Sequence, residues 1–177
     1  SSPIIIVPGD PKSVFLEIFI KTLKKIKIYN PIILVVSKEL LKNEMKNLNY
    51  RKKIIPLDKK NINSNKLKNN CINLINVERN TSHNKKDSKI SNRYIDACFE
   101  AAFEIIKRYN YVKFINGPIN KEKFLNKKFL GMTEYISKKF NVKNNAMLIY
   151  NKKLSVCPIT THLPLKFVTK KINKNEI

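Results

Sequence analysis

The first third of the chain alternates short apolar runs with helical patterns. Residues 4–7 and 32–36 are continuous runs of Ile, Leu and Val, and a Pro-Gly-Asp-Pro turn follows the first of them. Residues 12–27 repeat apolar side chains at helical spacing between the two runs, and Ser37 is placed to cap a helix after the second. Apolar strands that alternate with amphipathic helices are typical of a parallel sheet covered by helices. The pattern therefore predicts an α/β fold.

The rest of the chain adds one long helix and several shorter elements. Apolar side chains line one face of residues 92–108, and the apolar run over 111–115 follows as a strand. We also expect short strands at 54–57 and 71–75, loops at 58–70 and 76–92, helices at 120–127 and 131–140, and a hairpin of residues 146–150 and 154–159. No segment repeats another.

Composition adds a strong positive charge to this picture. Lys and Arg total 36 against 13 Asp and Glu, a net charge of +23, which favours nucleic acid or an anionic membrane as a partner. However, only four of these cations are arginine, the residue best suited to bidentate phosphate contacts, and the lysines are dispersed. Lys, Asn and Ile are abundant together and share A/T-rich codons. We therefore attribute the charge to base composition and expect no nucleic-acid or membrane partner, with a basic polyanion-binding module as an alternative.

The cysteine and hydropathy patterns indicate a reduced, cytoplasmic setting. The three cysteines form neither a Cys-x-x-Cys pair nor the even-numbered framework of small secreted proteins. The longest apolar runs are far shorter than the ~20 residues needed to cross a bilayer, and no export signal opens the chain. Because the chain begins with Ser and stops within a helical pattern, we expect it to be a fragment.

Glycine is scarce, and its positions mark the segments best suited to binding. The chain has three glycines, at 9, 117 and 131, where an average usage of ~7% predicts about twelve. Gly9 and Gly117 follow predicted strands, and ligands collect beyond the carboxyl ends of parallel strands. Gly131 opens a predicted helix, whose free N–H groups favour an anion, and Thr133 adds a hydroxyl donor. A turn or a cap explains each segment alone, but together they point to a site.

Generic catalytic motifs are absent, so single residues must be weighed. The chain has no GxGxxG, GxxxxGK[ST], HExxH or GxSxG sequence. His162 is the strongest single candidate, because it follows a predicted strand and lies between two threonines and a proline. A neutral imidazole there could bind a divalent metal, but one histidine does not make a metal site. The remaining ligands must come from elsewhere in the protein or from a second subunit.

Four segments together resemble the 4-hydroxythreonine-4-phosphate dehydrogenase family of pyridoxal phosphate biosynthesis, in order and in spacing. They are Gly9-Asp10-Pro11, Gly117-Pro118-Ile119-Asn120-Lys121, Gly131-Met132-Thr133-Glu134 and Thr160-Thr161-His162-Leu163-Pro164-Leu165. The resemblance covers about the N-terminal half of such an enzyme. It implies a three-layer α/β/α subunit similar to isocitrate and isopropylmalate dehydrogenases, truncated here. Residues 1–125 would belong to the first lobe, and residues 126–177 would begin the second lobe, which binds substrate and metal.

The resemblance also implies an activity. Members of the family are cytoplasmic homodimers with the active site at the subunit interface, and they oxidise 4-phosphohydroxy-L-threonine, a small phosphorylated amino acid, with NAD or NADP. The keto acid then loses carbon dioxide, and a divalent metal (zinc, magnesium or cobalt) polarises the hydroxyl and then the ketone. Carried over to this chain, His162 matches the first metal-binding histidine and Thr133 matches a substrate-binding threonine.

Two positions depart from the family pattern. Met132 stands where the family usually has a substrate-contacting histidine, and a thioether cannot donate a hydrogen bond to a phosphate or carboxylate. The opening Gly-Asp-Pro is followed by Lys12-Ser13-Val14 instead of a glycine-rich stretch. A degenerate or substrate-shifted paralogue of the family therefore stays open as an alternative. Because the other metal and phosphate ligands would lie beyond residue 177, we expect this chain alone to be inactive.

Overall fold

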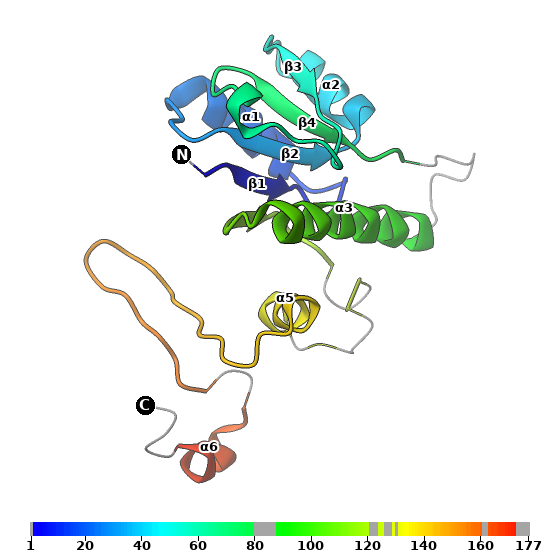
Figure 1. Cartoon of the computed structure of the whole chain (residues 1–177). Helices are drawn as coiled ribbons and strands as arrows, with labels where there is room; N and C mark the ends of the chain where they lie inside the picture. Colours follow the sequence, from blue (N-terminus) through cyan, green and yellow to red (C-terminus); the bar gives the residue numbers. More distant parts are fainter. Residues whose placement is uncertain are drawn as a thin grey trace. The chain divides into compact units, whose positions relative to one another are not determined.

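The apolar runs form one parallel sheet in the computed structural model of the chain (Figure 1), which describes residues 2–79, 88–120, 124–125, 129, 131–160 and 163–172. The strands are β1 (Ile4–Val7), β2 (Ile32–Val36), β3 (Ile54–Pro56), β4 (Ile72–Asn76) and β5 (Lys113–Asn116). Their order across the sheet is β3-β4-β2-β1-β5, and all neighbours run parallel. The α/β fold predicted from the alternating pattern is confirmed.

The chain divides into two compact units, Ser1–Phe124 and Leu125–Ile177. The first unit contains the sheet and the helices α1 (Phe15–Lys25), α2 (Lys38–Asn47), η1 (Ser64–Lys66, a 3-10 turn) and α3 (Ser88–Tyr109). The second contains α5 (Met132–Phe140) and α6 (Leu165–Lys171). Across the described ranges, every helix is too short or too polar to span a lipid bilayer.

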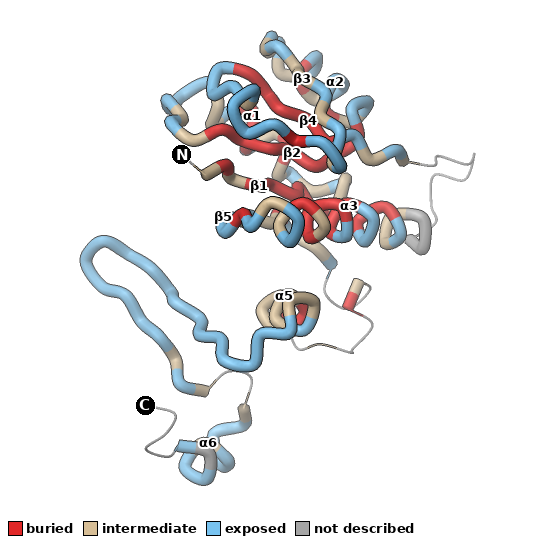
Figure 2. The backbone as a smooth tube through the Cα atoms, in the orientation of Figure 1, coloured by how far each residue is buried: buried red, intermediate tan, exposed pale blue. Residues whose placement is uncertain are grey.

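Helices cover both faces of the sheet, because successive strand residues point to opposite sides. On one face, Ile6 and Leu34 belong to a buried cluster that includes residues of α1 and α2. On the other face, the ring of Phe114 lies 6.1 and 5.8 Å from the rings of Phe99 and Phe103 in α3. Figure 2 shows buried positions concentrated along the strands and on α3. The first unit therefore has the predicted three-layer α/β/α arrangement.

Two buried polar groups are satisfied within these layers. Asn73, in the middle of β4, is fully buried, and its Nδ2 donates to two backbone carbonyls at 2.8 and 3.1 Å. The hydroxyl of Tyr94 in α3 accepts a hydrogen bond of 2.8 Å from the Ser37 N–H. Burial raises the pKa of Tyr94 and raises the pKa of Cys98 to about 12. The Tyr94 hydroxyl and the Cys98 thiol are therefore uncharged at neutral pH, which suits the apolar contact between α3 and the sheet.

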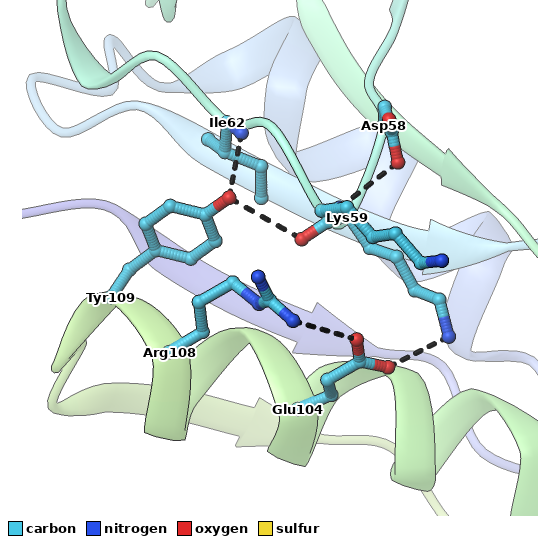
Figure 3. Close-up of polar contacts among 7 residues, drawn as sticks. Asp58, Lys59, Ile62, Glu104, Arg108 and Tyr109 are labelled. Atoms are coloured by element: carbon cyan, nitrogen blue, oxygen red, sulfur yellow. Dashed lines mark hydrogen bonds and ion pairs between the residues drawn. The ribbon is translucent and has the colours of Figure 1, made fainter.

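Polar contacts hold the connection between β3 and β4 against α3 (Figure 3). Lys59 Nζ lies 2.7 Å from one carboxylate oxygen of Glu104, and Arg108 lies 3.7 Å from the other. The hydrogen bond from Lys59 lowers the pKa of Glu104. The Tyr109 hydroxyl accepts from the Ile62 N–H at 2.8 Å and donates to the Lys59 carbonyl at 3.4 Å. The loop predicted over 58–70 is thus irregular, and both side-chain and backbone contacts hold it against α3.

Several element boundaries in the first unit differ from the prediction. The helix predicted over 12–27 spans Phe15–Lys25, and the strands predicted over 54–57 and 71–75 span Ile54–Pro56 and Ile72–Asn76. α3 begins at Ser88, so the loop predicted over 76–92 is wrong for residues 88–92. β5 begins at Lys113, two residues later than predicted. α3 ends at Tyr109, and Asn110 after it has a left-handed backbone conformation. Tyr111 is buried and stacks on Tyr109, with 5.6 Å between the ring centroids. An aromatic side chain packed inward at this position delays the start of the strand.

The second unit departs further from the prediction. In the described residues, the predicted hairpin over 146–159 forms a single antiparallel bridge, between Ile149 and Val156. These segments are extended and exposed, so they pair at one point without forming regular strands. Of the helix predicted over 120–127, residues 124–125 are helical and part of the remainder lies outside the described residues.

Candidate functional site

β1 and β5 mark the point where the chain changes direction across the sheet. From β1 the chain adds β2 on one side, and it later places β5 on the other. In open α/β sheets, ligands bind beyond the carboxyl ends of the strands at such a point. Pro8-Gly9-Asp10-Pro11 follows β1, and Gly117-Pro118 follows β5. The sheet therefore brings together two of the four segments predicted to form a site.

These two turns pack against each other backbone to backbone. The Asp10 N–H donates a hydrogen bond of 2.8 Å to the Pro118 carbonyl, and the Gly117 N–H donates one of 2.8 Å to the carbonyl of Val7 at the end of β1. A Cβ added to Gly117 would lie 1.9 Å from the Pro8 carbonyl oxygen, and one added to Gly9 would lie 2.3 Å from the Pro118 carbonyl oxygen. Gly9 also has a φ of +81°, which residues with side chains rarely adopt. The close backbone contact between the turns is thus sufficient to explain why positions 9 and 117 are glycine.

Asp10 contributes a carboxylate to the turn after β1. Its side-chain Oδ1 accepts a hydrogen bond from the Lys12 N–H at 2.9 Å, and its carbonyl accepts one from the Ser13 N–H at 2.9 Å. These contacts lead the turn directly into α1 and fix the half-buried carboxylate. A carboxylate held at this edge can accept hydrogen bonds from hydroxyl or ammonium groups. Sequence reasoning selected the turn but gave this carboxylate no role of its own.

The third predicted segment begins α5, in the second unit. Gly131 is the N-cap residue, with extended backbone, and it has no side chain to accept from the first N–H groups of the helix. Met132 and Thr133 are half-buried in the first turn. Uncapped N–H groups beside a threonine hydroxyl suit an anionic group. The predicted helix start is confirmed, and the substrate-binding role of the two residues stays a prediction.

Glu134 occupies the same first turn, and its carboxylate is incompletely paired. Its Oε2 is buried and has no hydrogen-bond partner in the described part of the chain. A buried polar atom without a partner costs on the order of 1–3 kcal/mol, more when it is charged. Favourable interaction with the helix dipole, about 0.3–1 kcal/mol, offsets only part of that cost. A hydrogen-bond donor from outside this chain would therefore stabilise the folded protein by pairing with Oε2. No sequence pattern could reveal this unpartnered oxygen.

The predicted metal ligand, His162, lies outside the described residues, as does Thr161. Pro164 is the N-cap residue of α6. Residues 154–159, predicted as the strand before His162, make the single bridge already described. Where the structure describes the chain, no group of three or more His, Cys, Asp or Glu could hold a metal ion. The metal-binding role of His162 therefore stays a prediction.

The chain is similar to one protein family and to curated members of it. The model of the family described as pyridoxal phosphate biosynthetic protein PdxA matches residues 27–177. The 4-hydroxythreonine-4-phosphate dehydrogenase of Aquifex aeolicus (strain VF5) is 40% identical over 74 residues, which cover 40% of this chain and 22% of that protein. The enzyme of the same name from Sulfurihydrogenibium sp. (strain YO3AOP1) is 29% identical over 172 residues, which cover 96% of this chain and 52% of that protein.

Solved structures share the fold. The 4-hydroxythreonine-4-phosphate dehydrogenase from Burkholderia phymatum gives a TM-score of 0.79 at 20% identity and covers 99% of this chain and 54% of its own. The enzyme of that name from Klebsiella pneumoniae gives 0.79 at 22% identity and covers 99% and 56%. The expected fold is therefore confirmed. The chain spans about half the length of the solved structures that it matches.

Proposed function

Because the chain belongs to the family of the pyridoxal phosphate biosynthetic protein PdxA, we propose that it is part of a 4-hydroxythreonine-4-phosphate dehydrogenase. The reaction proposed is the oxidation of 4-phosphohydroxy-L-threonine by NAD or NADP, in which C3 gives up a hydride and its hydroxyl gives up a proton. The bond between the keto acid and its carboxylate then breaks and carbon dioxide leaves, and the electron pair of that bond forms an enolate that takes up a proton to give the amino ketone. The family match over residues 27–177 carries this proposal.

The two units are proposed to be parts of the two lobes of such an enzyme. The first unit supplies a parallel sheet whose carboxyl edge is shaped by the turns after β1 and β5. The second unit supplies the start of α5, with Met132 and Thr133 in its first turn. The length of the chain supports the proposal that each lobe is incomplete, because the chain covers 52% of a relative that it matches along 96% of itself.

Thr133 is proposed to donate its hydroxyl to an anionic oxygen of the substrate. The N–H groups of the same helical turn, which Gly131 leaves uncapped, would bind and orient that oxygen. Glu134 would take a hydrogen-bond donor from the substrate or from the rest of the protein, because its Oε2 is unpartnered among the described residues. His162 would supply one metal ligand. We assign no step to a metal, because the described residues do not complete a site for one.

The exposed arm of the second unit supports a homodimer. Residues 142–159 form two extended segments, joined where Ile149 and Val156 exchange backbone hydrogen bonds of 2.8 and 2.9 Å. Leu148, Tyr150 and Leu154 are 61%, 72% and 70% exposed. A lone two-stranded ribbon is only marginally stable in water, and a contiguous apolar surface usually marks an interaction site. A second copy of the protein is the proposed cover of this arm.

Replacing Leu148 and Leu154 by aspartate is expected to weaken dimerisation of the full-length protein at least tenfold. Two charges would be buried at the interface without partners. Sedimentation at several protein concentrations measures the change. Asn61→Asp with Asn65→Asp places the same charges on exposed positions of the first unit and should leave the dimer intact. An unchanged dimer in the leucine variant would exclude the arm as the interface.

The full-length protein is expected to reduce NAD or NADP when 4-phosphohydroxy-L-threonine is added, as followed by the absorbance of the reduced nicotinamide. Thr133→Val keeps the side-chain shape and removes the hydroxyl donor. A hydrogen bond to a charged group contributes about 1.5 kcal/mol, so kcat/KM should fall roughly tenfold.

Thr169→Val is the matched control, because Thr169 lies exposed in α6. It should leave kcat/KM unchanged. The 177-residue chain by itself should show no activity, since it covers only 52% of a relative that it matches along 96% of itself. Failure of the full-length protein to reduce either nucleotide would contradict the proposed function, and it would favour the degenerate or substrate-shifted paralogue.

A further inference from the structure

A cavity opens at the edge of the sheet opposite the Gly9 and Gly117 turns. α2 ends at Asn47, and the chain reverses at Asn49, whose φ of 47° lies in the left-handed region. The Tyr50 N–H donates to the Met45 carbonyl at 2.8 Å and closes this reversal. Residues 51–53 then run beside the end of α2, and together they line a hollow of about 920 Å³ that is open to solvent. Since β3 begins here, the cavity lies at the amino ends of the strands.

The wall of this cavity is strongly cationic. Its lining residues are Lys42, Met45, Lys46, Asn49, Tyr50, Arg51, Lys52, Lys53 and Ile54, so five of nine are basic and none is acidic. Over the whole chain only 36 of 177 residues are basic. Within the described residues none of the five has an ion-pair partner. Base composition accounts for many lysines, but it does not account for their gathering around one hollow.

The fold holds these cations together against their mutual repulsion. Lys42 and Lys46 are one helical turn apart, and like charges at that spacing destabilise a helix by about 0.2–0.5 kcal/mol. The floor beneath them is fixed, because Met45 is buried and Tyr50 packs against the same core cluster. Lys24 adds a further cation 5.6 Å from the centroid of the Tyr50 ring. A fixed floor beneath several cations that have no ion-pair partner among the described residues favours a compact polyanion.

We propose that this cavity binds an oligophosphate chain, supplied by inorganic tripolyphosphate or by the triphosphate of a nucleotide. Lys and Arg donate charge-assisted hydrogen bonds to phosphate oxygens, and several closely spaced phosphates can engage several of these side chains at once. Single-stranded nucleic acid is disfavoured, because the cations surround one hollow instead of following a groove with successive stacking platforms.

Titration calorimetry of the full-length protein at fixed ionic strength tests this proposal with tripolyphosphate, ATP and orthophosphate as probes. Tripolyphosphate is expected to bind at least tenfold more tightly than orthophosphate. Neutralising the 51–53 run by Arg51→Gln, Lys52→Gln and Lys53→Gln should weaken tripolyphosphate binding at least tenfold. ATP that binds as tightly as tripolyphosphate indicates recognition of the phosphate chain alone, whereas ATP that binds tenfold more tightly identifies a nucleotide as the source.

The matched control carries Lys113→Gln, Lys166→Gln and Lys170→Gln, which remove the same charge from exposed positions of β5 and α6, outside the cavity lining and outside the arm. Its affinity for tripolyphosphate should stay within twofold of the unmodified protein. Equal losses in the two variants would show attraction by net charge and overturn the proposal, as would equal affinities for orthophosphate and tripolyphosphate. If the first variant fails to fold by circular dichroism, Lys42→Gln with Lys46→Gln replaces it, with the same tenfold loss expected.

Discussion

Gly117→Ala is expected to destabilise the first unit by about 3 kcal/mol or more. The added Cβ would lie 1.9 Å from the Pro8 carbonyl oxygen, 2.6 Å from the Pro8 carbonyl carbon and 2.8 Å from Cδ2 of Phe15. Overpacking in a well-packed interior costs about 1–3 kcal/mol, and more where the obstacle is backbone. The Pro8 backbone cannot retreat easily, because β1 is hydrogen-bonded on both sides, to β2 and to β5.

Urea unfolding followed by circular dichroism measures this effect as a fall in the midpoint at an unchanged slope. Gly9→Ala should be similarly damaging, since its Cβ would lie 2.3 Å from the Pro118 carbonyl oxygen at a φ of +81°. Lys12→Ala, at an exposed position beside the same turn, should change stability by less than about 0.5 kcal/mol. If Gly117→Ala is tolerated within 1 kcal/mol, the turns do not require glycine for packing, and a bound ligand becomes the better explanation for the two residues.

The sheet was predictable because the strands carry apolar side chains on both faces. All five residues of β2 are buried, as their unbroken apolar run indicates. The start of α3 was not predictable from its residues, because Ser88, Ser91 and Asn92 are poor helix formers. Helices take most of their stability from tertiary packing, and α3 is held by its later residues, including the fully buried Phe99.

The candidate site was predictable in its parts but not in their physical roles. Gly9 and Gly117 stand out in the sequence because glycine is scarce, and their positions after predicted strands indicate a ligand site. Their actual contact depends on the pairing of β1 with β5, which are distant in sequence, so no local pattern encodes it. The unpartnered oxygen of Glu134 is likewise a property of the folded turn. For Thr133 and Met132, sequence located the helix start correctly, and the binding role remains to be measured.

Met132→His is expected to raise kcat/KM for 4-phosphohydroxy-L-threonine about thirtyfold in the full-length protein. Met132 is the first residue of α5, half-buried beside the N–H groups that Gly131 leaves uncapped. A histidine there gains a ring N–H that can donate to an anionic oxygen of the proposed substrate, where the thioether has no donor. Hydrogen bonds to charged groups contribute about 1.5–3 kcal/mol, and roughly 2 kcal/mol corresponds to thirtyfold.

The control that isolates the donor is Met132→Leu, which keeps an apolar side chain of similar size and should leave kcat/KM within about twofold. Urea midpoints of both variants separate a change in binding from a change in folding. If Met132→His brings no gain while the unmodified protein is active, the first turn of α5 is built around the thioether, and a substrate without an anionic group at that position fits better. If neither protein is active, the degenerate paralogue is favoured. A gain confined to Met132→His would instead assign the missing contact to this one position. The rest of the first turn of α5 would then be able to bind the substrate without further change.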